Sequence, residues 1–215
     1  MIKKFGLEDS KPIKTPMSPE TKLTRDEDGE PIDNTKYHGM IGSSQLGLWY
    51  PKGTGIETIV YADFDYAGDY VDRKSTSGVC TFMGCCLTSW FSKKQTALAI
   101  STTEAEYVSV GKACQQALWM KQALVDYDIN LDDIRVLCDN KSAIDLSKNP
   151  VQQLSANQTY SKSTTIPSRD NVQKGNISIE KVSSEDNIAD ILTKPLKREP
   201  FSLLRLGLNL MEPNA

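Results

Sequence analysis

The spacing of apolar positions changes several times along the chain after residue 45. LGLWYP (46–51) and IETIVYAD (56–63) are apolar and rich in β-branched residues, and SGVCTFMG (77–84) and CCLTSWFSKK (85–94) follow after glycine-containing turns. Such runs predict three consecutive strands, paired as an antiparallel meander.

A helical spacing follows the strands, over residues 101–127. Its first turn carries Ser101 and Glu104 at the spacing of a capping box, which is typical of a helix start. The rest of the pattern predicts a short buried strand, a helix that ends before Pro150, a fifth strand and a last helix stopped by Pro195, at 134–139, 140–149, 176–182 and 185–194. The predicted order is βββαβαβα.

This order predicts an α/β fold with a five-stranded mixed sheet flanked by helices. The first three strands pair as hairpins, whereas strand-helix-strand crossovers favour parallel neighbours. Functional side chains in such sheets gather near the ends of the strands.

Four acidic residues fall at those strand ends and on the helices beside them: Asp63, Glu106, Asp139 and Asp190. Each has a structural explanation when it is considered alone. Asp139 is placed to cap the following helix, and Asp186 or Asp190 to interact with a helix dipole. Asp63 fits such a role less well, because an unpaired carboxylate is costly to bury on a strand.

Two further acidic residues compete with these candidates. Glu104 fits the capping role, whereas Glu106 shares its helical face with Val110 and Ala113, the side that should pack on the sheet. Asp65 lies on the same pleat face as Asp63, and a solvated position near a turn is its simpler explanation.

Taken together, four carboxylates from two strands and two helices are the ligand set that hard divalent cations prefer. Two Mg²⁺ ions held in this way can hydrolyse a phosphodiester without a histidine nucleophile. The chain has one histidine, His38, which lies in the proline-rich lead-in, and it has no P-loop. Serine-histidine catalysis and Walker-type nucleotide hydrolysis are therefore disfavoured.

Composition and charge limit the partners and the cellular compartment that the sequence predicts. A net charge of −3 and a pI near 5.3 mean that a nucleic-acid partner must be held by a local basic patch. Five cysteines without a C-x-x-C pair predict a reducing compartment rather than a disulfide framework. No stretch has the length and apolarity of a membrane span, so the sequence predicts a soluble intracellular protein, cytoplasmic or nuclear.

Four motifs carry a family resemblance: YADFDYAGDYVDRKSTSGVCTFMG, SWFSKKQTALAISTTEAEYVSV, LCDNKSAIDLSKNP and NIADILTKPL. Over residues 46–210 they resemble the ribonuclease H domain of the Pol polyprotein of copia-type LTR retrotransposons. The resemblance implies a ribonuclease H-like fold and hydrolysis of the RNA strand of an RNA/DNA hybrid with two Mg²⁺ ions, for which Mn²⁺ can substitute.

The resemblance also implies roles for individual residues. Asp63, Glu106, Asp139 and Asp190 fall on the four catalytic, metal-binding carboxylates of the family pattern, with Asp63 as the ligand shared by both metals. Contacts to the phosphates of the hybrid are expected from six polar residues near the strand ends: Arg73, Lys74, Ser75, Lys93, Lys94 and Gln95.

Residues 1–45 resemble the C-terminal end of the reverse transcriptase in the same polyproteins, as an extended remnant. Several tens of residues normally follow that end, whereas here Ser44 joins Gln45 directly. The polymerase motif is absent, so this chain is not expected to polymerise DNA. The resemblance implies an RNA/DNA hybrid and the reverse transcriptase and integrase portions of the parent polyprotein as partners.

The segment 151–168 departs from the family, which carries a basic, histidine-containing stretch there. This chain has a polar stretch of nearly the same length without histidine. A pair of compensating frameshifts in a decayed genomic copy would give this pattern. The alternatives to an active nuclease are therefore a catalytically inactive fragment or a non-catalytic nucleic-acid-binding module of the same fold.

Overall fold

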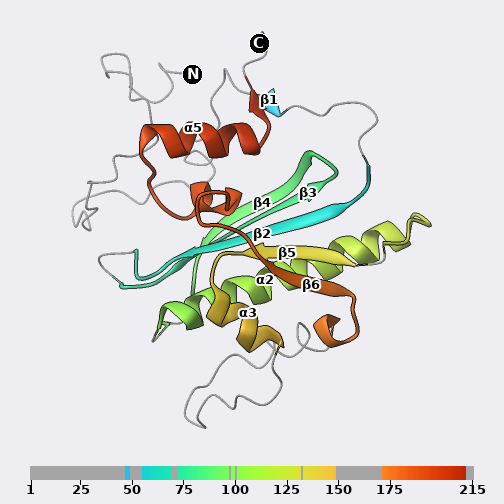
Figure 1. The fold of residues 1–215 in the computed structure, drawn as a ribbon, viewed down its shortest axis with the longest axis horizontal. Helices are drawn as coiled ribbons and strands as arrows, with labels where there is room; N and C mark the ends of the chain where they lie inside the picture. Colours follow the sequence, from blue (N-terminus) through green and yellow to red (C-terminus); the bar gives the residue numbers. More distant parts are fainter. Residues whose placement is uncertain are drawn as a thin grey trace, which may run out of the picture.

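A five-stranded mixed sheet forms the centre of the molecule, in the spatial order β4-β3-β2-β5-β6 (Figure 1). The computed structural model describes residues 47–48, 55–68, 72–96, 98–99, 101–131, 133–148 and 171–211. The strands of this sheet are β2 (Thr58–Asp65), β3 (Thr76–Met83), β4 (Cys86–Lys94), β5 (Ile134–Cys138) and β6 (Ile177–Lys181).

The topology confirms the predicted α/β fold with a five-stranded mixed sheet. Strands β2, β3 and β4 form an antiparallel meander, and β5 and β6 join beside β2 as parallel strands. The register between β2 and β5 runs from Ile59 to Tyr61 on β2. It therefore ends two residues before Asp63, which lies opposite Gly78 of β3.

Helices α2 (Thr102–Val125) and α3 (Lys141–Lys148) cover one face of the sheet (Figure 1). As predicted, Ser101 caps α2: its side chain accepts a hydrogen bond from the Glu104 amide at 3.2 Å. The apolar side of α2 packs on β2, β5 and β6, and Val60, Val110 and Ile177 are among the residues of this core.

The opposite face is covered by a 3-10 helix, η2 (Ile188–Leu192), and by α5 (Arg198–Gly207). The predicted regular helix over 185–194 was therefore wrong in type. Asn187 caps η2 by accepting a hydrogen bond from the Ala189 amide, and Pro195 has no N–H to continue a helical hydrogen-bond ladder, so a helix here is confined to residues 188–194.

Helix α5 and a small ribbon beside it were not predicted from the sequence. Strands β1 (Gly47–Leu48) and β7 (Leu210–Met211) pair with each other and are separate from the main sheet. The apolar run at 46–51 therefore adds no strand to the main sheet in its described part. A signal for α5 was present in the spacing of Leu204 and Leu208, both of which are buried.

The remnant predicted for residues 1–45 and the altered segment 151–168 lie outside the described residues. Within the part of the chain that the structure describes, no helix has the length and apolar character needed to cross a bilayer.

Gly78 allows η2 to approach the sheet beside Asp63. A Cβ atom at this position would lie 2.6 Å from Thr193 Cγ2 and 3.1 Å from the Ala189 carbonyl oxygen. Since one of these contacts is with backbone, any larger residue must push η2 away from β3.

We expect Gly78→Ala to lower the free energy of unfolding by about 1–3 kcal/mol, because the added methyl group overpacks this contact. Gly55→Ala is the matched control, since a Cβ atom there meets nothing within 4 Å. Urea unfolding measures both, and equal stabilities of the two variants would contradict the close approach of η2.

Candidate metal centre

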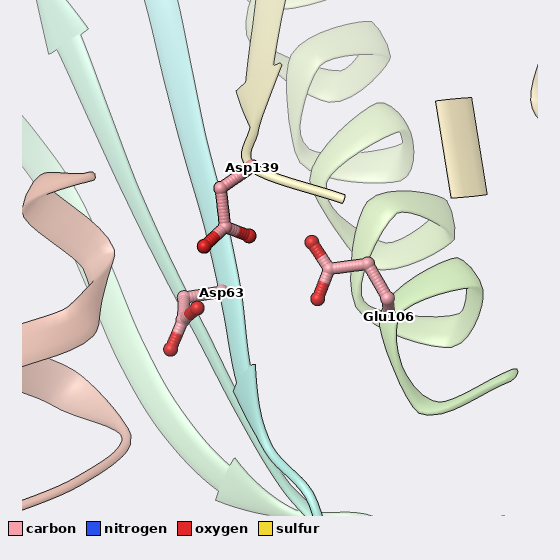
Figure 2. A group of neighbouring side chains, drawn as sticks. All are labelled: Asp63, Glu106 and Asp139. Atoms are coloured by element: carbon pink, nitrogen blue, oxygen red, sulfur yellow. The ribbon is translucent and has the colours of Figure 1, made fainter. Parts of the chain in front are cut away.

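Three of the predicted carboxylates meet at one place. Asp63 lies on β2, Glu106 on the first turns of α2, and Asp139 directly after β5 (Figure 2). One ligand oxygen from each residue lies within 4.8 Å of the other two. Residues separated by more than seventy positions in sequence thus present oxygen ligands to a common point.

Side chains from both sides of the sheet fix the backbone around Asp63. The buried Ser109 hydroxyl, on α2, donates to the Asp63 carbonyl oxygen at 2.6 Å. From the other face, the side-chain amide of Asn187 donates to the Ala62 carbonyl oxygen at 3.0 Å. These hydrogen bonds hold the end of β2 in place beyond the point where its pairing with β5 stops.

Glu106 lies fully inside the protein, on the sheet-facing side of α2 predicted from the sequence. Neither of its carboxylate oxygens has a hydrogen-bond partner among the described residues. A buried carboxylate without a partner is unfavourable, and a hard cation would satisfy it. The donor set and this unpaired carboxylate therefore fit a divalent metal ion.

Asp139 is free of the capping role that the sequence also allowed. The neighbouring Asn140 caps α3 instead, because its side-chain oxygen accepts from the Ala143 amide at 3.1 Å. The half-buried Asp139 carboxylate accepts a hydrogen bond from the Ser184 hydroxyl at 2.7 Å. This hydrogen bond orients Asp139 toward the other carboxylates. Because Asn140 caps α3, Asp139 has no capping role.

Asp190 stands beside this group, on the side of η2, and is linked to it through a lysine. The Lys194 ammonium lies 3.0 Å from Asp190 Oδ2 and 3.7 Å from Asp63 Oδ2. The Thr193 hydroxyl also donates to Asp63 Oδ2. Sequence reasoning missed Thr193 and Lys194, although both belong to the quoted NIADILTKPL motif.

Burial and mutual repulsion shift the protonation of the central carboxylates. Burial, together with the charge of Asp190, raises the pKa of Asp63 to about 8. Burial and the charges of Asp63 and Asp139 raise the pKa of Glu106 to about 9. For Lys194, burial lowers the pKa, but the charges of Asp63 and Asp190 outweigh it and raise the value.

The six residues predicted to contact nucleic acid divide into two groups. Arg73, Lys93 and Lys94 are exposed and Lys74 is half-buried, so their charges face the solvent. Ser75 and Gln95 are buried, with exposed fractions of 1% and 4%.

Both buried members make hydrogen bonds within the protein. The Ser75 hydroxyl accepts from the Ala67 amide, and the Gln95 amide donates to Ser77 Oγ and to the Ala105 carbonyl oxygen. These hydrogen bonds tie the end of β4 to β3 and α2, and the start of β3 to the turn after β2.

One further cation, Lys112 of α2, was not foreseen. Its ammonium donates to Ser77 Oγ at 3.3 Å, and Ser77 lies opposite Lys93 in the β3–β4 register. Burial and the charge of Lys93 lower the pKa of Lys112. Lys112 lies six positions after Glu106 on the same helix.

Several curated proteins similar to this chain are Pol polyproteins from transposons. The retrovirus-related Pol polyprotein from transposon RE1 of Arabidopsis thaliana is 30% identical over 251 residues, which cover 95% of this chain and 17% of the polyprotein. The polyprotein from transposon RE2 of the same plant is 31% identical over 236 residues, covering 89% and 16%. This chain is homologous to the Pol polyproteins of copia-type transposons.

The chain spans about a sixth of the length of these Pol polyproteins. The 251 positions aligned with the RE1 polyprotein exceed the 215 residues of the whole chain, so some tens of positions have no counterpart here.

This Pol-related chain was also compared with protein-family models and with solved structures. It matches no protein-family model. Among solved structures, the N-terminal ribonuclease H domain of a Mycobacterium tuberculosis protein is 12% identical with a TM-score of 0.41, covering 71% of this chain and 98% of that domain.

We expect the metal-free chain to lose stability as the pH rises from about 4 to about 9. The folded-state pKa values of Asp63 and Glu106, about 8 and about 9, lie above the ordinary carboxyl values, so the folded chain binds more protons than the unfolded one in this window. Glu106→Gln should therefore stabilise the chain in EDTA by about 1 kcal/mol or more near pH 8, and by much less near pH 4.

Chemical unfolding at the two pH values measures this difference. Glu180→Gln, at an exposed position on β6, is the matched control and should change stability little at either pH. A Glu106→Gln effect of equal size at both pH values would show that the carboxylate is not penalised by its burial.

Proposed function

We propose that this chain is an endoribonuclease that hydrolyses the RNA strand of RNA/DNA hybrids with divalent metal ions. The observation that carries the proposal is the fully buried Glu106 carboxylate, which faces Asp63 and Asp139 and has no hydrogen-bond partner in the described part of the chain. Homology to Pol polyproteins supports the same class of activity.

The residues that would hold the ions are Asp63, Glu106, Asp139 and Asp190. Mg²⁺, or Mn²⁺ in its place, supplies the activation of a water molecule and the stabilisation of the leaving oxygen in phosphodiester hydrolysis. The chain's own part is to hold these carboxylates on a rigid sheet. Ser109 and Asn187 fix the backbone beneath Asp63, and Ser184 orients Asp139.

The hybrid would be held by cations around the centre. Lys93 and Lys94 end strand β4, directly before the helix that carries Glu106, while Arg73 and Lys74 precede β3. Lys112 adds a positive charge beside Lys93. Phosphate contacts of this kind fix the position of a duplex without reading its sequence.

A second candidate, a retained fold without hydrolysis, is favoured by the sequence of residues 151–168. The basic, histidine-containing stretch of the resembled family is replaced there by polar residues. The candidate predicts binding of hybrids without metal-dependent cleavage. In either case the reverse transcriptase and integrase portions of a parent polyprotein are the proposed partners.

We expect Asp63→Asn to reduce metal-dependent cleavage of a labelled RNA/DNA hybrid by about a hundredfold or more, because a charged ligand at the centre is lost. Asp65→Asn, on the same face of β2, is the matched control and should retain most of the activity. Gel analysis of the RNA strand with Mg²⁺ or Mn²⁺ measures both, and binding of the hybrid should be unaffected in either variant. Cleavage by Asp63→Asn at the parent rate would refute the proposal.

We expect the double variant Lys93→Ala and Lys94→Ala to bind the hybrid more weakly, with a salt dependence reduced by about one unit of slope per lost phosphate contact. Fluorescence anisotropy across a series of salt concentrations measures this slope. Replacement of the exposed Lys174 and Lys181 by alanine is the control for total charge. An equal loss of affinity in both double variants would mean that binding is not local to the end of β4.

A further inference from the structure

Lys194 brings a fixed positive charge into the candidate metal centre. Its ammonium lies within 4 Å of two carboxylates, at 3.0 Å from Asp190 Oδ2 and 3.7 Å from Asp63 Oδ2. Asp63 is almost fully buried, whereas the Lys194 side chain remains about one third exposed. The lysine thus reaches from the surface toward a carboxylate that solvent does not reach.

The backbone before Lys194 is fixed, so this approach is built into the fold. The Lys194 amide donates to the Asp190 carbonyl oxygen at 3.3 Å, and the preceding Thr193 hydroxyl shares its one proton between that oxygen and Asp63 Oδ2. The absence of a side chain at Gly78 lets Thr193 pack against β3. One oxygen of Asp63 therefore receives donors from two consecutive residues.

The exposed pair of Lys94 and Asp72 shows how Lys194 differs from an ordinary surface ion pair. Both members of that pair are about half exposed, so water screens their charges. Lys194 instead faces a buried carboxylate, where screening is weak and like charges repel strongly. A divalent ion that binds between Asp63 and Asp190 must displace this ammonium or bind close to it.

We propose that Lys194 is a positioning residue that acts as an internal cation: its ammonium compensates the negative charge of Asp63 and Asp190 in the metal-free chain. The same positive charge weakens the binding of a divalent ion between these two carboxylates. The inference rests on the proposed function. It makes the two metal positions unequal: an ion held by Asp63, Glu106 and Asp139 binds first, and an ion shared by Asp63 and Asp190 binds second and more weakly.

The test compares metal binding and stability in three variants of the full chain. Lys194→Met keeps the length of the side chain and removes its charge, and Lys194→Arg keeps the charge. Lys174→Met removes a charge from an exposed position and is the matched control. Binding of Mn²⁺ is counted by electron paramagnetic resonance, and thermal unfolding is followed in EDTA and with Mn²⁺.

In Lys194→Met we expect the weaker Mn²⁺ ion to bind about tenfold more tightly or better. The melting temperature of Lys194→Met in EDTA should be lower than that of the parent chain. Addition of Mn²⁺ should raise the melting temperature of this variant more than that of the parent. Lys194→Arg and Lys174→Met should bind Mn²⁺ like the parent. If Lys194→Met does not fold in EDTA, refolding on addition of Mn²⁺ is the expected result.

Unchanged or weaker Mn²⁺ binding by Lys194→Met would overturn the inference, as would failure of that variant to fold with Mn²⁺ present. Failure of the proposed function has a different signature. If the parent chain binds no Mn²⁺ but Lys194→Met does, the internal cation is supported and the parent is not a metal-dependent nuclease. If neither chain binds Mn²⁺, both proposals fail.

Discussion

The burial of negative charge at the centre of the sheet is the constraint on which the rest of this structure depends. Glu106 is completely shielded from solvent and Asp63 nearly so. Burial raises the pKa of both carboxyl groups; the charge of Asp190 raises that of Asp63 further, and the charges of Asp63 and Asp139 raise that of Glu106 further. A fold selected for stability alone would place apolar side chains here. Retaining these carboxylates makes physical sense if a cation is to neutralise them.

The surrounding elements provide hydrogen bonds to the backbone at the end of β2. The central carboxylates remain close to one another. Ser109 and Asn187 engage backbone carbonyl oxygens at the end of β2, and Asn140 takes over the cap of α3, so that Asp139 is available to the centre. Gly78 admits η2 to the sheet, which brings Lys194 beside Asp63. Rigid backbone and unsatisfied side-chain oxygens are the combination that binding sites for hard ions require.

The homologous Pol polyproteins are much longer than this chain. About a sixth of the relatives' length is represented, and some tens of their aligned positions are missing. The centre nevertheless lies wholly within the described β2, α2 and η2 segments and the residues after β5. Its assembly depends on contacts between those elements, so metal binding can be examined in this chain directly.

The sequence by itself determined the order of strands, the mixed sheet, the start of α2 at Ser101 and the sheet-facing side of Glu106. These features follow from local periodicity and capping, which are written in neighbouring residues. The four acidic candidates were also visible, because carboxylates at the ends of apolar strands are conspicuous.

Only the tertiary structure decided which carboxylates share a point, that η2 is a short 3-10 helix, and that Ser75 and Gln95 turn inward. It also revealed Lys194, whose significance lies in its proximity to Asp63, 131 positions away in the chain. Such contacts depend on how helices and sheet pack in space, and a pattern of neighbouring residues does not encode that packing.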